Sequence, residues 1–447
     1  MYILIQTDEK VKLKQKKFPR FSKKIDNACK IVYNRRVGGE EMSKIAIIGG
    51  GAAGLMLAAN LNISSKDHEI VLFERGERVG RKLSATGNGQ GNITNLHVTE
   101  GGYFSFNSAD TERANRIIRT YDDTDLKAFF ARLGIILTAD DRGRVYPASR
   151  QASSLTDGLR YYLQHKGIKT NVGCLVTAIE KKGDGFSIRY KTEDTPNNRY
   201  DNADFVIICA GGNAAKNFGT DGSGYALAKS FGHTVTPIYP SLVQLKTDTT
   251  NIKGLKGIRI NNAKLTAKMP QGKASVQGDI IFTEYGVSGD AVFRLTPFIV
   301  GKNLEGTSLA IDFLPDLDEE TIWEHIVCKT SKYDIGVSEG LFGIVNNQLG
   351  RMIMRFANND CGKAAALVKA FPLRVTGSLG FDYAQVTKGG IPLSETDENL
   401  QSRLADGLYF AGEILDVDGE CGGYNLQWAY SSARVVANAV CNAINRK

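Results

Sequence analysis

The sequence of 447 residues lacks the cysteine and histidine patterns that mark disulfide-rich or zinc-stabilised proteins. Its seven cysteines are scattered, no two form a CxxC pair, and no histidine stands at a ligand spacing beside them. An odd number of isolated cysteines is typical of a chain kept in a reducing compartment. We therefore expect a cytoplasmic protein with no disulfide framework and no metal site.

Long hydrophobic runs are also missing from the sequence. The longest, such as FVIICA and VVANAV, fall far short of the roughly 18 residues that a membrane-spanning helix needs. The N-terminal MYILIQT is followed by charged residues, whereas a secretory signal continues into an apolar core and a cleavage site. We expect no membrane partner.

An excess of one charge sign is absent from most of the chain, although the net charge is +8. Residues 1–41 hold 11 Lys/Arg and 5 Asp/Glu, which leaves 45 and 43 in the remaining 406 residues. A nucleic-acid partner would have to bind the N-terminal section alone. The charge pattern therefore favours a small-molecule substrate over a nucleic acid, and it indicates no oligomeric state.

Residues 1–42 form a basic extension without a clear helical or strand period. Two hypotheses fit this extension: a disordered arm, or translated upstream DNA with the natural start at Met42. We prefer the second hypothesis, because Gly-Gly-Glu-Glu before Met42 is what a purine-rich ribosome-binding sequence would encode in frame.

A dinucleotide-binding pattern follows at once. The apolar run Ile45–Ile48 is typical of a buried parallel strand, and Gly49, Gly51 and Gly54 then stand at GxGxxG spacing before an Ala- and Leu-rich helix. The first glycine permits the tight turn, the second lets the backbone approach a pyrophosphate, and the third permits close packing of helix on strand. A second strand, EIVLFE, ends in Glu74, 20 residues beyond Gly54, where a carboxylate would bind a ribose hydroxyl.

A matching feature near the C-terminus favours FAD over NAD as the dinucleotide. In GLYFAGEILDVDGECGGYNLQWA a strand ends at Gly412-Glu413, and Gly422-Gly423 opens a helix. Glu413 can accept a hydrogen bond from a ribityl hydroxyl, and the helix start can direct N–H groups at the pyrimidine edge of the flavin. The plainer interpretation is an acidic turn before a surface helix.

The segment GRKLSATGNGQGNITN, Gly80–Asn95, is unusually rich in glycine and asparagine. FAD extending from Glu74 would pass this segment, and its glycines would let the backbone lie against the isoalloxazine ring while its amides offer hydrogen bonds. We therefore interpret it as a flavin-binding loop; a surface linker is the alternative.

The complete set of expected cofactor-binding residues combines these motifs with Val176, in an alternating half-buried strand, and Ala210-Gly211, at the end of another strand. Both could equally be plain sheet residues. The set consists of Gly49, Gly51, Ala53, Gly54, Glu74, Arg75, Arg81, Lys82, Thr86, Gly87, Asn88, Gly89, Asn92, Val176, Ala210, Gly211, Gly412, Glu413, Gly422, Gly423, Asn425 and Leu426. The candidate catalytic residues are Tyr424 as a proton donor, Lys82 and Lys388. His233 follows a helical segment and is expected to be a capping or core histidine.

Six motifs in this order resemble bacterial NAD(P)/FAD-dependent oxidoreductases of the aminoacetone-oxidase-like and bile-acid-reductase-like type. They are IAIIGGGAAGL, GRKLSATGNGQGNITN, GRVYPASRQASSL, GDIIFTEYGVSGDAV, VTKGGIPLSE and GLYFAGEILDVDGECGGYNLQWA. The resemblance extends from about Ser43 to the C-terminus. Family members commonly carry Arg-Cys in place of Gln90-Gly91 and a glycine in place of Ala433, so chemistry that depends on that cysteine does not transfer to this chain.

The resemblance implies an α/β fold with a discontinuous Rossmann-type FAD-binding domain and an inserted β-barrel-like plus small helical domain. Residues 43–240 and 376–447 would form the FAD-binding domain, and residues 241–375 the insert, with a helical block at about 316–370. Helix-patterned sequence from DEETIWEHIVCKT to GKAAALVKAF agrees with that block.

Flavin chemistry leaves three enzymatic functions open, beside a flavin-binding protein without turnover. The first is reduction of an activated C=C or C=N bond with NADH or NADPH as a transient electron donor, since no second GxGxxG unit is present. The second is an amine or alcohol oxidase that passes electrons to oxygen, and the third is an RNA-associated flavoprotein. We expect the reductase.

Overall fold

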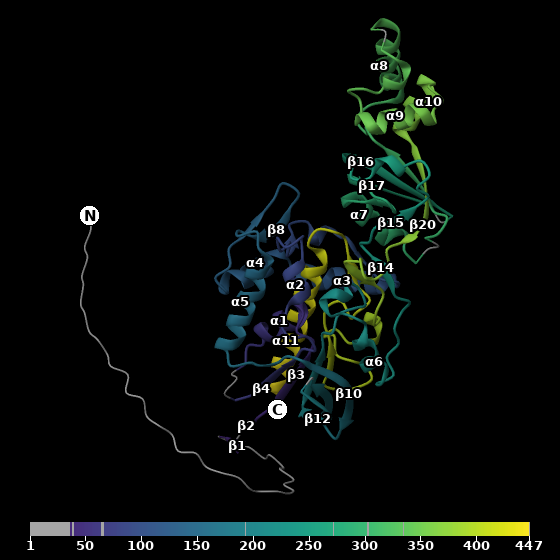
Figure 1. Ribbon diagram of the computed structural model, residues 1–447. Coiled ribbons are helices and arrows are strands. Elements are labelled where there is room, and N and C mark those ends of the chain that lie inside the picture. Colours follow the sequence, from purple (N-terminus) through teal and green to yellow (C-terminus); the bar gives the residue numbers. More distant parts are fainter. Residues whose placement is uncertain are drawn as a thin grey trace, which may run out of the picture.

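The computed structural model describes residues 36–37, 40–63, 67–192, 194–270, 272–301, 304–333 and 335–446. Most of the expected basic extension lies outside these residues. Three parts follow one another in space: a large α/β body, a barrel beside it, and a small helical block at the far end of the barrel (Figure 1).

The body is built on a parallel sheet in the order β22-β13-β3-β4-β9. The strands are β3 (Lys44–Ile48), β4 (Glu69–Phe73), β9 (Lys169–Asn171), β13 (Phe205–Ile208) and β22 (Leu408–Phe410). The apolar side chains of β3, β4, β13 and β22 are buried, as continuous apolar runs predict for parallel strands covered on both faces, whereas the edge strand β9 is polar and largely exposed. In this order β13 lies between β3 and β22, which comes from near the end of the chain.

Helices of both ends of the chain pack around this sheet. Helix α1 (Ala52–Asn60) and the 21-residue α11 (Tyr424–Ile444) contact one another along their length. The other helices of the body are α2 (Arg81–Ala85), α3 (Ser108–Thr120), α4 (Asp123–Arg132), α5 (Ala152–His165) and α6 (Ser223–Lys229). Among them, α5 packs on α1 and α2, so the segment after β4 is held against the first helix.

Smaller sheets complete the body. An antiparallel sheet joins β10 (Cys174–Lys182), β11 (Gly185–Thr192) and β12 (Thr195–Ala203), and another joins β5 (Thr94–Asn95), β8 (Arg144–Pro147) and β7 (Leu137–Ala139). Two-stranded pairs are β6 (Tyr103–Phe104) with β23 (Asp418–Gly419), and β1 (Arg36–Val37) with β2 (Glu40–Glu41).

The chain leaves the body and returns to it through neighbouring strands, β14 (Tyr239–Ser241) and β21 (Val386–Lys388). Between them six strands close a barrel in the order β15-β18-β17-β16-β19-β20. These are β15 (Leu245–Thr247), β16 (Arg259–Met269), β17 (Gly272–Phe282), β18 (Gly286–Ser288), β19 (Ser308–Asp312) and β20 (Phe371–Ser378). Helix α7 (Asp290–Ile299) packs on β17 and β16.

Three helices, α8 (Glu319–Lys332), α9 (Asn347–Phe356) and α10 (Cys361–Lys369), form the helical block between β19 and β20. Side-chain caps from Asp318, Asn346 and Asp360 start them. The barrel and this block share one apolar core, and the body has its own. The predicted fold class, a Rossmann-type α/β domain with a barrel-like and helical insert, is confirmed.

Candidate functional site: a dinucleotide channel that opens on the barrel

The glycine turn after β3 has the geometry that a dinucleotide needs. Gly49 has a φ of 110°, and its N–H donates to the carbonyl oxygen of Phe73 over 2.8 Å. A side chain on Gly54 would overlap the carbonyl oxygen of Gly49, so helix α1 can pack on the turn only with glycine there. A Cβ on Gly51 would meet no atom within 4 Å. The free space therefore lies above Gly51, where α1 begins and presents its N-terminal N–H groups.

The acid at the end of β4 borders the same space. One oxygen of Glu74 accepts the N–H of Gly50 at 2.8 Å and the other accepts the N–H of Gly76 at 2.6 Å. These bonds fix the carboxylate at the wall of the cavity, where it can accept further hydrogen bonds from ribose hydroxyls.

Two arginines of the predicted set line this end as well. Arg75 is paired with Asp221, and Arg81 donates to the carbonyl oxygen of Asn217 at 3.0 Å. Burial alone would raise the pKa of Asp221, but its hydrogen bonds to Arg75 and Ser223 outweigh this and lower that pKa. Asp221 therefore stays ionised and keeps Arg75 in place.

Glu413 brings the C-terminal motif to the first one. Its Oε2 pairs with Nζ of Lys82 at 2.7 Å, and its Oε1 accepts the N–H of Thr387 at 2.9 Å. Gly412, directly before it, does not line the cavity: a side chain there would lie 2.6 Å from the Cβ of Ala53, so this glycine permits the contact between α1 and the end of β22. Lys82 and Glu413 form a half-buried ion pair in the cavity wall.

The glycine-asparagine loop contributes to the cavity wall, and its members differ in position. Thr86, Gly87 and Asn88 border the cavity, whereas Gly89 does not. Asn92 also borders it, yet its amide is buried and donates to the carbonyl oxygens of Thr94 and Val145 at 2.9 and 3.1 Å. Main-chain hydrogen bonds link the residues of this loop, and Gly91 packs closely on helix α5.

The start of helix α11 borders the cavity through Gly422, Gly423, Asn425 and Leu426. Asn425 accepts the N–H of Gly419 and donates to its carbonyl oxygen, both at 2.8 Å, and so fixes the loop before the helix. No acid lies in the first turn of this 21-residue helix, so no carboxylate there neutralises the positive end of its dipole at the cavity. Of the remaining predicted residues, Val176, Ala210 and Gly211 also line the cavity, and Gly54 packs behind it.

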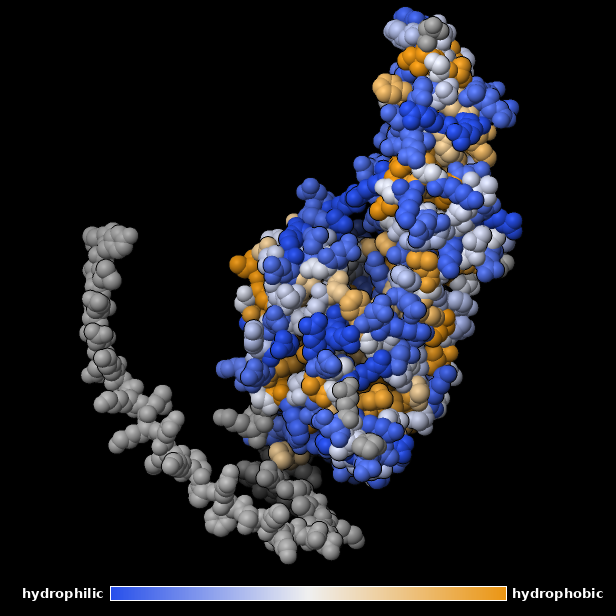
Figure 2. All heavy atoms as spheres, in the orientation of Figure 1, coloured by the Kyte–Doolittle hydropathy of each residue, from blue (hydrophilic) through white to orange (hydrophobic). Residues whose placement is uncertain are grey.

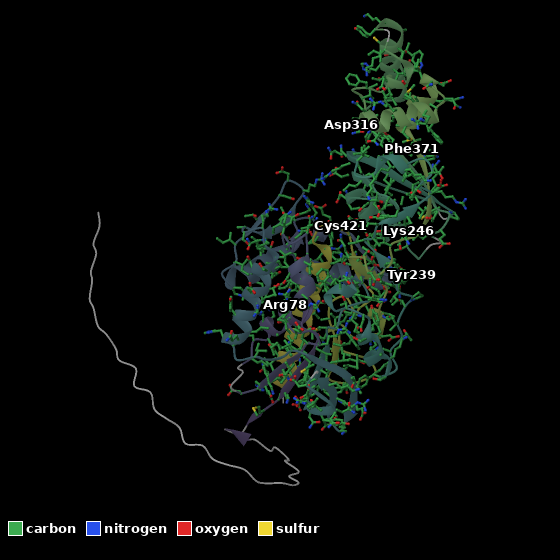
Figure 3. All side chains as sticks on the ribbon, in the orientation of Figure 1. Arg78, Tyr239, Lys246, Asp316, Phe371 and Cys421 are labelled. Carbon is green, nitrogen blue, oxygen red and sulfur yellow. The ribbon has the colours of Figure 1, made fainter. Side chains whose placement is uncertain are left out.

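These walls enclose one continuous cavity of about 990 Å³. Its lining extends from Arg78 to Cys421, which Figure 3 labels on the body and near the barrel, respectively. Figure 2 shows the surface hollowed where the body meets the barrel. The volume is at the upper end of the roughly 300–1,000 Å³ found for cofactor and small-molecule sites. The open space at Gly51, the acid at Glu74 and two helix N-termini on one channel fit FAD.

Two of the three candidate catalytic residues do not line this cavity. Lys388 is buried, pairs with Asp418 at 3.4 Å and lies over the rings of Phe104 and Phe106. Burial raises the pKa of Asp418 to about 6, although Lys388 acts to lower it. Side chains alternate across the short β23 segment, so Val417 borders the cavity while Asp418 points to the other side.

The side chain of Tyr424 turns away from the cavity in the same manner. Its ring packs on Tyr103, and its hydroxyl donates to the carbonyl oxygen of His97 at 3.5 Å. Burial, with the nearby charge of Glu420, raises the pKa of Tyr424 to about 12. His233, expected to be a capping or core residue, is buried between Glu395 and Ser402 at 2.7 Å from each.

The sequence reasoning assigned no role to the residues that line the barrel end of the cavity. They come from the β7–β8 hairpin and the segment after it (Asp140, Arg142, Arg144, Tyr146, Arg150) and from the barrel side (Arg259, Asp279, Asp290, Phe293). The only available signal was the motif GRVYPASR, which supported the resemblance without a chemical role.

The fold and the site define an FAD-dependent oxidoreductase of the Rossmann class. The family described as "HI0933-like protein Rossmann domain" matches residues 43–439, so the chain belongs to this family. The expected resemblance is thereby confirmed. Among the residues that the structure describes, no helix is long and apolar enough to cross a bilayer.

Individual relatives add detail. The chain is 35% identical over 415 residues to a 3-dehydro-bile acid delta(4,6)-reductase of Clostridium scindens, which covers 89% of this chain and 99% of the relative. It is 28% identical over 419 residues to a ribosomal RNA dihydrouridine synthase of Haemophilus influenzae, covering 90% and 99%. A solved 3-ketosteroid-delta4-(5alpha)-dehydrogenase of Rhodococcus jostii matches with a TM-score of 0.49 at 14% identity, over 90% of this chain and 97% of the other.

Proposed function

We propose that the enzyme uses NADH or NADPH to saturate a C=C bond conjugated to a carbonyl group in a small organic substrate. The observation that carries the proposal is the continuous cavity, which joins the dinucleotide-binding motifs to a chamber at the barrel. The name of the 35% identical relative describes a reductase of ring double bonds. The name of the 28% identical relative describes formation of dihydrouridine, which is uridine with one ring double bond saturated. Both names thus support reduction of C=C over reduction of C=N.

A bound FAD would supply the two-electron chemistry. The protein would hold its pyrophosphate at Gly51 and the start of α1, and its adenosine ribose at Glu74. Glu413 would accept a ribityl hydroxyl, and Lys82 would keep that carboxylate oriented and neutralised from 2.7 Å away. Lys82 then supports the cofactor site and does not act as an acid or base.

The donor and the substrate would use the chamber in turn. The sequence contains no second GxGxxG unit, and the chamber opens between the body and the barrel (Figure 2). The nicotinamide ring would bind there transiently and then be replaced by the substrate, so that both would meet the same face of the flavin in turn.

Steady-state turnover tests the proposal. Purified FAD-loaded protein is mixed with NADH or NADPH and with 3-oxo-4-cholenoic acid, a conjugated enone of the kind that the bile-acid relative's name describes. The expected result is consumption of the nicotinamide donor matched by a product two hydrogen atoms heavier. Donor consumption without a heavier product contradicts the proposal.

The same preparation distinguishes the other two functions. An amine or alcohol oxidase would produce hydrogen peroxide from a small amine or alcohol in air without a nicotinamide donor. An RNA-directed enzyme, which the two dihydrouridine synthase relatives make the strongest competitor, would form dihydrouridine in ribosomal RNA and leave the enone unchanged.

A further inference from the structure

The chamber at the barrel contains four arginines, and three of them face a carboxylate. Arg144 pairs with Asp140 at 2.7 Å, Arg259 is paired with Asp279, and Arg142 lies 3.7 Å from Asp290. Despite burial, the hydrogen bonds of these partners to arginine lower the pKa values of Asp140 and Asp279, so both acids stay ionised at neutral pH and neutralise their arginines.

Arg150 is the exception in this group. It lines the cavity, and among the residues that the structure describes no carboxylate lies within ion-pair distance of it. Glu420 also borders the chamber, and no ion pair joins it to Arg150. A guanidinium that faces a cavity without a counter-charge raises the local concentration of anions there.

The side chain and the backbone of Arg150 are both held in place. The guanidinium carbon lies 4.1 Å from the centre of the Tyr146 ring, so the two groups are stacked. Stacking leaves the N–H groups at the edge of the guanidinium free to form a two-bond contact with a carboxylate. The φ of Arg150 is 52°, which costs a non-glycine residue of the order of 1 kcal/mol, and such outliers persist mostly at functional sites.

Tyr146 supplies the second polar group. The residue is 6% exposed and borders the cavity. A phenolic hydroxyl can donate one hydrogen bond and accept others. The Tyr146 hydroxyl can therefore donate a hydrogen bond to a ligand that lies beside Arg150.

The N-terminus of helix α5 adds to the positive electrostatic potential at Arg150. Arg150 lies two residues before Ala152, the first residue of this 14-residue helix, which has no acid in its first turn. The N-terminal dipole and the guanidinium both favour a negative group at this end of the chamber.

We propose that Arg150 and Tyr146 together bind a carboxylate of the substrate, so that the enzyme acts on conjugated enones that carry an acid group. This inference rests on the proposed reductase function, because it assigns the chamber to the substrate. Arg150 would accept the charge, and the Tyr146 hydroxyl would donate a further hydrogen bond and fix the orientation of the acid group.

Binding to the oxidised FAD-loaded protein tests the proposal without turnover. 3-Oxo-4-cholenoic acid and its uncharged methyl ester are titrated separately, and the shift of the visible flavin absorption gives each dissociation constant. The wild-type protein should bind the acid more tightly than the ester. Arg150→Gln should weaken binding of the acid by about tenfold or more, which is the range for loss of a charge-assisted contact, and leave the ester unchanged. Arg150→Lys should recover part of the lost affinity, and Tyr146→Phe should weaken binding of the acid by a few-fold.

Arg119→Gln is the matched control, because Arg119 is an exposed arginine on α3 outside the cavity. All variants should keep the wild-type flavin content and unfolding temperature. Equal loss of acid and ester affinity in Arg150→Gln, or no loss, overturns the proposal. It is also overturned if Arg150→Gln raises only the KM for NADPH and not for NADH, because Arg150 then binds the phosphate of the donor. If the acid binds as expected but is never reduced, the proposed reductase function fails and the binding site stands.

Discussion

Two glycines of the same turn should respond in opposite ways to the same substitution. In Gly51→Ala the added methyl group meets no protein atom within 4 Å, and the backbone there, at φ −79°, suits alanine. The protein without cofactor should therefore unfold at the same free energy or up to about 1 kcal/mol higher, because alanine restricts the unfolded chain. In Gly54→Ala the methyl group overlaps the carbonyl oxygen of Gly49, a main-chain atom that cannot move without moving β3.

The Gly51→Ala substitution should weaken FAD binding, whereas Gly54→Ala should mainly lower the free energy of unfolding. The methyl group of Gly51→Ala would occupy the space where the pyrophosphate approaches the backbone. Overpacking of this size costs typically about 1–3 kcal/mol, which corresponds to roughly 5- to 150-fold weaker FAD binding. For Gly54→Ala we expect a loss of about 3 kcal/mol or more in unfolding free energy, since helix α1 must shift away from the turn.

Urea unfolding of the cofactor-free proteins and titration with FAD, followed by flavin fluorescence, separate stability from affinity. Ala58→Gly, four residues after Gly54 in the same helix and outside the cavity lining, controls for a general effect on helix α1. Gly51→Ala with wild-type FAD affinity would refute the assignment of this space to the pyrophosphate. Destabilisation of Gly51→Ala without cofactor would refute the geometry of the turn.

Further predictions concern the two buried polar clusters outside the cavity. Lys388→Met leaves Asp418 buried without its cation and should cost roughly 3–5 kcal/mol of unfolding free energy at pH 8. The cost should be smaller at pH 5: the pKa of Asp418 is already raised to about 6, the variant raises it further, and the protonated acid needs no counter-charge. Urea midpoints at the two pH values check this, and Lys388→Met combined with Asp418→Asn should recover most of the loss; an equal cost at both pH values would contradict the pairing. His233→Leu should lower stability by about 1–3 kcal/mol, because Glu395 and Ser402 lose a buried partner, with kcat unchanged in the turnover assay; a large fall in kcat would instead place His233 in the chemistry.

The sequence predicts the fold, and it predicts which residues gather at the end of the cavity near Gly51 and Glu74, because those features are local. Strand, glycine turn, helix and acid lie within about thirty residues, so spacing alone indicates how Gly49, Gly51 and Glu74 meet one ligand. The second anchor at Glu413 was also recognisable, since it repeats the pattern of a strand end followed by a helix start.

The substrate end was not predictable in the same manner, because long-range packing creates it. Arg142 and Asp290 are far apart in sequence and meet only where the β7–β8 hairpin reaches helix α7. Sequence also cannot show that Lys388 is neutralised by Asp418 on the far side of the cavity wall, or that Arg150 alone among its neighbours faces no acid. Position beside a motif therefore predicts a catalytic role for Tyr424 and Lys388, although neither residue lines the cavity.

The most direct test of the central claim is an anaerobic two-step experiment on the FAD-loaded wild-type protein. NADH or NADPH is first added until the visible flavin absorption is bleached, and 3-oxo-4-cholenoic acid is then added in the absence of oxygen. We predict that the absorption returns in proportion to the enone added, with the saturated ketone as product. Persistent bleaching in the presence of excess enone, or failure of both nicotinamide donors to bleach the flavin, would contradict the account.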